Sequence, residues 1–450
     1  MNQVTSTGGG TIRILIVGGG CAGLTAARRL QRELRDELRS GRAEITLVEA
    51  APYLTYRPLL PEVAAGSIDP RHVVVPLRRE LPGCRVLTGR IARVDHGRRL
   101  AWLAPQDGVT VELPYDEVIL TVGSISRTAP VPGLAEHGRG FETVAEAVAL
   151  RNHVLDQLDL ASSTRDPELQ QAALTFVFVG GGYAGVGALA ELADMARDAL
   201  RGYPTIQPED LRWVLVEAGP GILAEAEPEL AAHALGLLRD RNIDVRLKTT
   251  LESAQDGLML LSDGSKFAAR TLVWTAGVRP APVLAATDLP LDRDGRVRCL
   301  PTLQAVQPDG TPLPGAWAAG DCAAVPEGPA GQCRPNAQHA FAQAELLAGN
   351  LLAVRAGGPP QPYRAPQTEA SASLGPYRAV ARSRGRSLTG RRAWLLHRAR
   401  TLRRLPSADR RVRVLADWLL GGLFAREPVS LGSLEHPRAE FRAAARDPED

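Results

Sequence analysis

Residues 13–23 read RILIVGGGCAG, and this stretch decides the fold. The four apolar residues Ile14 to Val17 are typical of a strand buried on both faces of a parallel sheet. Three glycines follow at the spacing Gly18, Gly20 and Gly23, and Ala22 to Leu38 is expected to form a helix. The first glycine allows a tight turn, the second lets the backbone approach a pyrophosphate, and the third lets helix and strand pack closely. The stretch therefore predicts a phosphate-binding turn at a helix N-terminus.

The residues after this helix favour a nucleotide over an ordinary glycine turn. Glu44 to Val48 is expected to be a second apolar strand, and it ends at Glu49. An acid in this position accepts hydrogen bonds from the ribose hydroxyls of an adenine nucleotide. Glycine clusters also form plain turns, so the strand and its terminal acid carry the prediction.

The same arrangement occurs a second time. Leu174 to Val179 is an apolar run, followed by GGGYAG with the glycines at Gly180, Gly182 and Gly185. A helix over residues 184–200 and a strand over 213–216 come next, and the strand ends at Glu217. A further strand, residues 271–274, leads to Gly277. Two such units predict an α/β protein with two Rossmann-like domains that bind two dinucleotides.

Length, charge and cysteine usage exclude several classes of protein. With 450 residues the chain is long enough for two or three domains, and its formal charge of +3 by itself argues neither for nor against a nucleic-acid partner. We expect no nucleic-acid partner, because the basic segment near the C-terminus has no aromatic platform beside it. No charged and apolar leader and no run of 18 apolar residues occur, so we expect a cytoplasmic protein without a membrane span. The five cysteines form no CxxC pair and no histidine cluster is present, so neither a dithiol centre nor a metal site is expected.

Between and after the two units lie segments with distinct patterns. Prolines 58, 61, 70 and 76 predict a wrap of loops and short helices, with a plain surface excursion as the alternative. Residues 86–88, 91–94, 99–103 and 109–113 are expected to form an antiparallel piece, before an apolar strand at 118–122. Thr143 and Glu146 predict a capping box for a helix to about residue 160. A strand over 316–319 ends at Gly320 and Asp321, whose carboxylate could bind flavin ribitol hydroxyls or cap a helix.

These motifs together resemble those of type II NADH dehydrogenases, single-chain flavoenzymes that pass electrons from NADH to a membrane quinone. The resemblance runs from about residue 14 to 423 and includes motifs outside the glycine turns, namely YRPLLPEVAAG, TVGS, VEAGP, WTAGV, AAGDCA, NAQHAFAQ and SLGPYRAVA. It implies an FAD-binding domain in two parts, 11–170 and 289–370, an inserted NADH-binding domain, 171–288, and a C-terminal region, 371–450.

The resemblance also implies roles for individual residues. FAD would be held by Gly18, Gly20, Gly23, Glu49 and Asp321, with Pro58, Leu59 and Leu60 near the isoalloxazine. NADH would be held by Gly180, Gly182, Gly185, Glu217 and Gly277. Glu217 also predicts a preference for NADH, because a carboxylate repels the 2′-phosphate of NADPH and VEAGPGIL offers no arginine to bind it.

Two positions depart from the family pattern. A glutamate usually lies two residues after the last glycine of the second turn, where this chain has Gly187. The quinone pocket usually has two glutamines four residues apart; this chain keeps Gln338 but has Ala342, with Gln343 one place along. A one-residue shift turns a helical side chain by about 100°. Arg378 keeps a cation where lysine is frequent, so Gln338 and Arg378 are the expected quinone-site residues.

The sequence of the C-terminal region is compatible with two arrangements, docking on a membrane or packing on the body of the protein. Residues 378–413 contain thirteen arginines and one acid, Asp409. A second helix, about 412–424, places four apolar residues on one face with Trp418 at its edge. Basic residues over an apolar face suit an anionic membrane, which would make the protein peripheral on the inner face of the cell membrane. The alternative is a helix pair packed on the body, and a homodimer also stays open.

The expected activity is hydride transfer from NADH to FAD, followed by transfer of two electrons to a quinone without proton pumping. One alternative is a soluble FAD-dependent NAD(P)H reductase with another acceptor, because the quinone glutamines are altered. A catalytically weak nucleotide-binding regulator is the other.

Overall fold

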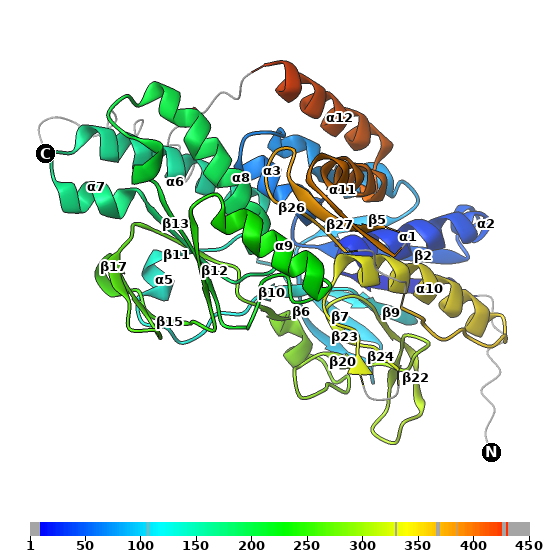
Figure 1. Ribbon diagram of the computed structural model, residues 1–450. Coiled ribbons are helices and arrows are strands. Elements are labelled where there is room, and N and C mark those ends of the chain that lie inside the picture. The colour runs from blue at the N-terminus through cyan, green and yellow to red at the C-terminus, as the bar shows by residue number, and fades with distance from the viewer. Residues whose placement is uncertain are drawn as a thin grey trace, which may run out of the picture. The chain divides into compact units, whose positions relative to one another are not determined.

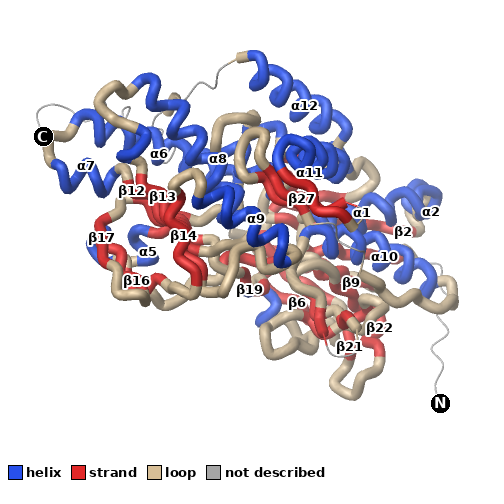
Figure 2. The backbone as a smooth tube through the Cα atoms, viewed as in Figure 1, coloured by secondary structure: helices blue, strands red, loops and turns tan. Residues whose placement is uncertain are grey.

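The computed structural model describes residues 10–105, 108–328, 331–365, 370–383, 385–424 and 429–430. The chain divides into two compact units (Figures 1 and 2). Unit 1 comprises Met1–Tyr56, Val74–Arg127 and Val278–Thr368, and unit 2 comprises Arg57–Val73, Thr128–Gly277 and Glu369–Asp450.

Unit 1 is built on a six-stranded sheet in the order β21-β22-β9-β1-β2-β5. All neighbours are parallel except β21 and β22. The central strand β1 carries the apolar run, and Ile14 and Ile16 are at most 1% exposed. The strands span Ile12–Val17 (β1), Ala43–Glu49 (β2), Arg85–Thr88 (β5), Glu117–Leu120 (β9), Gln304–Val306 (β21) and Pro312–Ala318 (β22).

The sequence prediction for the strand at residues 86–88 was wrong in its partner. This strand, β5, pairs in parallel with β2 in the main sheet. The antiparallel piece consists of the next three strands, which span Arg90–Asp95 (β6), Leu100–Ala104 (β7) and Val111–Pro114 (β8). Two short strands and several short helices lie between β2 and β5, so tertiary packing and not sequence proximity decides which neighbour this short strand joins.

Two long helices of unit 1 pack on each other, α1 (Cys21–Glu33) and α10 (Ala337–Arg355). The helix expected over residues 22–38 is interrupted at Leu34, and α2 (Arg35–Arg39) follows. Because α2 buries none of its residues, no packing extends α1 through its polar tail. Smaller pairs complete the unit: β3 (Tyr53–Thr55) with β4 (Val74–Pro76), β10 (Ser124–Ser126) with β19 (Val278–Pro280), β20 (Val297–Arg298) with β23 (Ala323–Ala324), and β24 (Pro326–Glu327) with β25 (Gly331–Gln332).

Unit 2 has a five-stranded parallel sheet in the order β11-β18-β12-β13-β14. Every residue of β12 is buried, as expected for a strand in the middle of a parallel sheet. The strands span Gly138–Arg139 (β11), Thr175–Val179 (β12), Arg212–Glu217 (β13), Ile243–Leu247 (β14) and Thr271–Trp274 (β18), and a small antiparallel sheet is formed by Leu251–Ser253 (β15), Leu258–Leu261 (β16) and Lys266–Ala268 (β17).

One helix of unit 2, α6, begins where the sequence predicts a capping box. Thr143 accepts a hydrogen bond from the Glu146 amide, and the Glu146 carboxylate accepts one from the Thr143 amide, which confirms the capping box of α6. The helices of this part span Leu134–His137 (α5), Val144–Ser163 (α6), Pro167–Ala173 (α7), Tyr183–Ala199 (α8) and Pro228–Arg239 (α9).

The proline-rich wrap and the C-terminal helices also belong to unit 2. The wrap contains the short helices η1 (Arg57–Leu59), α3 (Leu60–Ala64) and η2 (Pro70–His72), and α3 packs on α6 and α8. The C-terminal part forms a three-stranded antiparallel sheet and two helices, which span Ser371–Ser373 (β26), Ala379–Ser383 (β27), Arg386–Thr389 (β28), Gly390–Arg404 (α11) and Ala408–Leu423 (α12).

Candidate functional site: two dinucleotide cradles

The first glycine turn is fixed by contacts that leave no room for side chains. Gly18 has a φ of +104°, and a Cβ at Gly23 would overlap the carbonyl oxygen of Gly18. Around Gly20, by contrast, a Cβ would meet nothing within 4 Å. The turn is thus closed on its inner side and open where a ligand would approach.

Two side chains hold this turn in place. Glu49, at the end of β2, accepts hydrogen bonds from the amides of Gly19 at 2.6 Å and Ala50 at 2.7 Å. Thr121, which follows β9, donates toward the carbonyl oxygens of Val17 and Gly18, at 3.1 and 2.8 Å. The expected ribose-binding acid is therefore already oriented by the backbone of the turn.

The second turn in unit 2 repeats this geometry. Gly180 has a φ of +114°, and a Cβ at Gly185 would overlap the Gly180 carbonyl oxygen. Glu217 accepts from the amides of Gly181 and Gly219, both at 2.6 Å. Thr275 donates toward the carbonyl oxygens of Val179 and Gly180, at 3.0 and 3.1 Å.

The N-termini of both helices that follow these turns are suited to binding an anion. Neither α1 nor α8 has a side-chain cap or an acid in its first turn, and their capping residues are Gly20 and Gly182. A Cβ at Gly182 would also meet nothing within 4 Å. The free amides and the positive end of each helix fit a pyrophosphate, so both cradles fit a dinucleotide.

Sequence reasoning missed the roles of Thr121 and Thr275. Each threonine ties the glycine turn to the strand beside it, and a glycine with positive φ follows two residues later, Gly123 at +64° and Gly277 at +78°. The signal was present as the paired tripeptides TVG after β9 and TAG after β18.

Asp321 lies one turn beyond β22, in the same unit as the first glycine turn. Its carboxylate accepts a hydrogen bond from the Ser124 hydroxyl at 2.7 Å. The adjacent Gly320 has a φ of +80°, and its amide donates to the Gln343 side chain at 2.8 Å. Gln343 is 1% exposed, so its side chain is buried against this turn.

The repeated strand, glycine turn, helix and acid match a known family model. The model described as pyridine nucleotide-disulphide oxidoreductase covers residues 12–344 of the chain. The chain belongs to this family. The division into two dinucleotide cradles follows from the family fold.

Two relatives that match most of the chain have names that state an activity. The chain is 27% identical to the "Type II NADH:quinone oxidoreductase Ndh" of Mycobacterium tuberculosis, over 92% of this chain and 89% of the relative. It is 29% identical to the "Type II NADH:quinone oxidoreductase" of Haemophilus influenzae, over 76% and 80% of the two chains. These relatives confirm the resemblance drawn from the motifs.

A solved structure has the same fold. The structure of NDH2 from Plasmodium falciparum in complex with NADH matches with a TM-score of 0.84, over 93% of this chain and 100% of that one. The two sequences are 16% identical, so the fold is what they share.

Within this oxidoreductase fold, the position of the absent family glutamate has a packing explanation. A Cβ at Gly187, on α8, would lie 3.2 Å from the Cγ of Pro61, on α3. Such an approach is tighter than most carbon contacts, so a side chain here would require Pro61 to shift by a few tenths of an ångström. One helical turn along, Glu191 is 2% exposed and accepts from the Ser373 hydroxyl at 3.2 Å.

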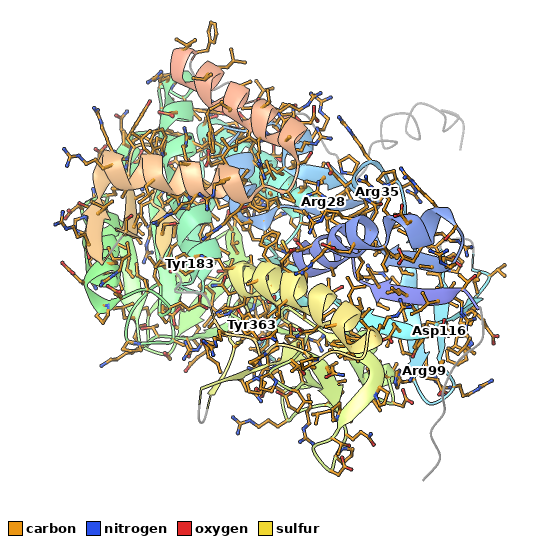
Figure 3. All side chains as sticks on the ribbon, turned by 90° about the vertical axis from the view of Figure 1, so that its right-hand side faces the viewer. Arg28, Arg35, Arg99, Asp116, Tyr183 and Tyr363 are labelled. Atoms are coloured by element: carbon orange, nitrogen blue, oxygen red, sulfur yellow. The ribbon has the colours of Figure 1, made fainter. Side chains whose placement is uncertain are left out.

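The remaining expected site residues are divided between the units. Gln338 lies at the start of α10 in unit 1, where its backbone amide donates to the Asn336 side chain at 2.8 Å. Its neighbour His339 contacts the Tyr363 hydroxyl at 2.8 Å, and Figure 3 shows Tyr363 beside α10. Arg378 lies in unit 2 and pairs with Asp194 at 3.3 Å. Pro58 and Leu59 form η1 in unit 2, where Leu59 is fully buried.

None of the five thiols is paired in a disulfide, and three of them, Cys299, Cys322 and Cys333, are buried. All five cysteines are free, and burial raises the pKa of Cys322 to about 12. A thiol with so high a pKa supplies little thiolate. Within the described ranges, no group of three or more histidine, cysteine, aspartate or glutamate residues could hold a metal ion.

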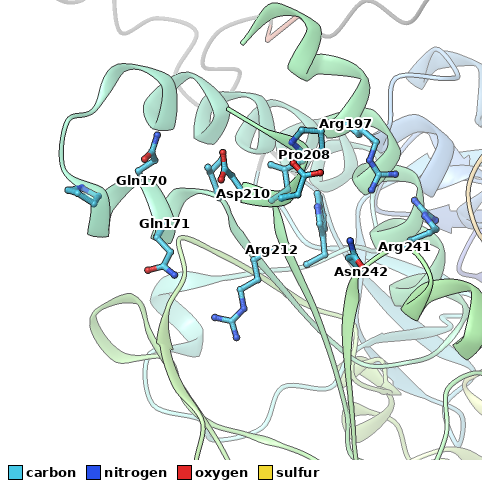
Figure 4. A pocket seen from close by; sticks show the side chains of 13 residues that line it. Gln170, Gln171, Arg197, Pro208, Asp210, Arg212, Arg241 and Asn242 are labelled. Carbon is cyan, nitrogen blue, oxygen red and sulfur yellow. The ribbon is translucent and has the colours of Figure 1, made fainter. Parts of the chain in front are cut away.

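A polar cavity of about 710 Å³ opens in unit 2 (Figure 4). Its lining includes Leu174, Arg212 and Asn242, which lie at or just before the amino ends of β12, β13 and β14. Ligands of open α/β sheets bind at the carboxyl ends of strands. The cavity is therefore separate from the nucleotide cradle, which lies at the opposite edge of the same sheet.

Proposed function

We propose that the protein is an FAD-dependent NADH dehydrogenase that passes two electrons to a quinone without pumping protons. The paired cradles, each with its own oriented glutamate, carry this proposal. The names of the relatives, type II NADH:quinone oxidoreductases at 27–29% identity, support the acceptor. When bound, FAD accepts a hydride from NADH and returns the electrons as a pair.

The residues of the chain bind and orient the two dinucleotides. Gly18, Gly20, Gly23 and Glu49 hold the pyrophosphate and adenine ribose of FAD, and Asp321 hydrogen-bonds its ribitol, with Pro58 and Leu59 near the ring. Gly180, Gly182, Gly185, Glu217 and Gly277 hold NADH. Gln338 and Arg378 contact or polarise the quinone. The domains follow these roles: 11–170 and 289–370 for FAD, 171–288 for NADH, and 371–450 for membrane docking.

Purified protein tests the activity directly. We expect a yellow preparation that retains FAD and oxidises NADH when a short-chain ubiquinone or menaquinone analogue is added. Rapid flavin reduction by NADH without reoxidation by either quinone would refute the acceptor while keeping the dehydrogenase. A colourless protein that binds no FAD would refute both.

A soluble reductase with a different acceptor is the second candidate. Ala342 occupies the position of the second quinone glutamine, and the neighbouring Gln343 is buried against Gly320, so its side chain does not replace that glutamine. This arrangement favours the second candidate. Reoxidation of the reduced flavin by a small redox protein, faster than by any quinone, would support this candidate instead.

We also propose that α12 docks on an anionic membrane from the cytoplasmic side. Val412, Leu419 and Leu423 on α12 are 69%, 62% and 78% exposed. Exposed arginines flank this apolar face: Arg403, Arg404, Arg411 and Arg413. No helix within the described ranges could cross a membrane. Apolar residues beside arginines match the interface of a bilayer with negative headgroups.

Vesicle sedimentation tests the docking. The wild-type protein should sediment with phosphatidylglycerol vesicles and much less with phosphatidylcholine vesicles. Leu419→Asp should lower sedimentation with the anionic vesicles, while Leu258→Asp, at an exposed leucine of β16, should not. A second copy of the chain is the alternative occupant, and a dimer lost in Leu419→Asp without any change in vesicle binding would replace the membrane proposal.

A further inference from the structure

A buried carboxylate in unit 2 connects the C-terminal helices to the proline-rich wrap. Glu62, on α3, is 5% exposed. One of its oxygens accepts from the Arg398 guanidinium at 3.0 Å and from the Trp418 indole N–H at 2.6 Å. These donors come from α11 and α12, more than 330 residues later in the chain.

The arginine of this cluster, Arg398, contacts two aromatic rings. Its guanidinium carbon lies 3.9 Å from the ring centre of Trp394 and 4.5 Å from that of Trp418. Burial lowers the pKa of Arg398. A guanidinium between two indoles and against a buried carboxylate has little freedom to move, so it fixes α11, α12 and α3 with respect to one another.

A second contact joins α12 to the same wrap. Asp417, the residue before Trp418, accepts from the backbone amide of Asp69 at 3.2 Å and contacts the His72 ring nitrogen at 2.6 Å. The wrap is therefore held by α12 at both α3 and η2. The apolar residues of α12 that are exposed point to another side of the helix.

The wrap also touches the helix of the second glycine turn. Pro61, next to Glu62, packs against Gly187 of α8 so closely that only glycine fits there without a shift. Gly187 lies in the second turn of α8, whereas the glycine turn before that helix is held separately by Glu217 and Thr275.

We propose that Glu62 is a positioning residue through which Arg398 and Trp418 of the C-terminal helices fix the wrap that carries Pro58 and Leu59. The inference rests on the proposed function only in that Pro58 and Leu59 lie near the flavin. The C-terminal helices then support turnover directly, in addition to any membrane contact. Loss of either donor loosens the wrap and lowers kcat, because the flavin ring loses a fixed neighbour, while the Glu217 cradle for NADH stays intact.

Trp418→Phe is the sharpest test, because it removes the N–H and keeps a ring on Arg398. We expect amide hydrogen exchange in residues 57–73 to become about 10- to 100-fold faster, the effect of losing a hydrogen bond to a charged group. In the FAD-loaded protein, kcat with a soluble quinone should fall while KM for NADH stays within about twofold, and the visible flavin spectrum should shift.

Trp102→Phe is the matched control, since Trp102 also donates to a glutamate, Glu112 at 3.2 Å, but at an exposed site in unit 1. Glu62→Gln is the second variant, because it removes the charge and keeps an acceptor for Trp418. Unchanged exchange over 57–73 in both Trp418→Phe and Glu62→Gln would overturn the inference. The exchange measurement needs no acceptor, so it distinguishes failure of this inference from failure of the quinone proposal.

Discussion

Replacement of Glu217 by glutamine should change the choice between NADH and NADPH. A carboxylate has about four lone-pair positions. In Glu217 two of them accept from the amides of Gly181 and Gly219, so two remain for the two hydroxyls of the adenine ribose. A glutamine has one oxygen, and its NH₂ group must face either a backbone N–H or a hydroxyl.

The size of the effect follows from these contacts. A hydrogen bond to a charged group contributes about 1.5–3 kcal/mol, so its loss should lower kcat/KM for NADH by about 10- to 150-fold. For NADPH the variant removes a repulsion of about 1–4 kcal/mol for two unit charges 4 Å apart. The ratio of kcat/KM for NADH over NADPH should therefore fall by about 100-fold or more.

Steady-state kinetics with both nucleotides and one soluble quinone measure this ratio. Glu252→Gln, an exposed glutamate of β15, is the control and should leave the ratio unchanged. If Glu217→Gln kept the wild-type ratio within about threefold, the carboxylate would not face the ribose, and the cradle as described would be wrong.

Three further predictions concern the turns and the stability of the units. Gly23→Ala should abolish FAD retention, because its Cβ would overlap the Gly18 oxygen, whereas Gly236→Ala, with open space around it, should not; flavin absorbance after gel filtration measures both. Gln343→Leu should release FAD faster than wild type, since the Gly320 amide loses its acceptor, and flavin fluorescence follows the release. Burial lowers the pKa of His153 to about 4, so the folded form stays neutral below pH 6.5 while the unfolded form takes up a proton. The melting temperature should fall from pH 6.5 towards 4, and less steeply in His153→Gln.

The local signals in the sequence predicted the two cradles well. The strands before each glycine turn, the helices after them and the terminal acids Glu49 and Glu217 are where the pattern indicates. These features depend on neighbouring residues, because a tight turn needs glycine and a buried parallel strand needs an apolar run. The capping box of α6 is local in the same way.

Other features depend on contacts between distant segments. No spacing rule indicates that Gln343 supports Gly320 or that Pro61 packs tightly against Gly187. The apolar pattern of α12 was visible, yet it also fitted a helix packed on the body. In the structure α12 combines the two arrangements. Its leucines are exposed, and Trp418 donates a hydrogen bond to the buried Glu62.

The sequence by itself therefore determined two nucleotide-binding units, their order along the chain and the acids that end their second strands, Glu49 and Glu217, since each unit lies within fewer than fifty consecutive residues. The tertiary structure decided which strand β5 joins, that Pro61 packs against position 187, and how α11 and α12 are held on the wrap. Those outcomes depend on pairing and packing between segments that are tens to hundreds of residues apart, and a linear pattern does not indicate which segments meet.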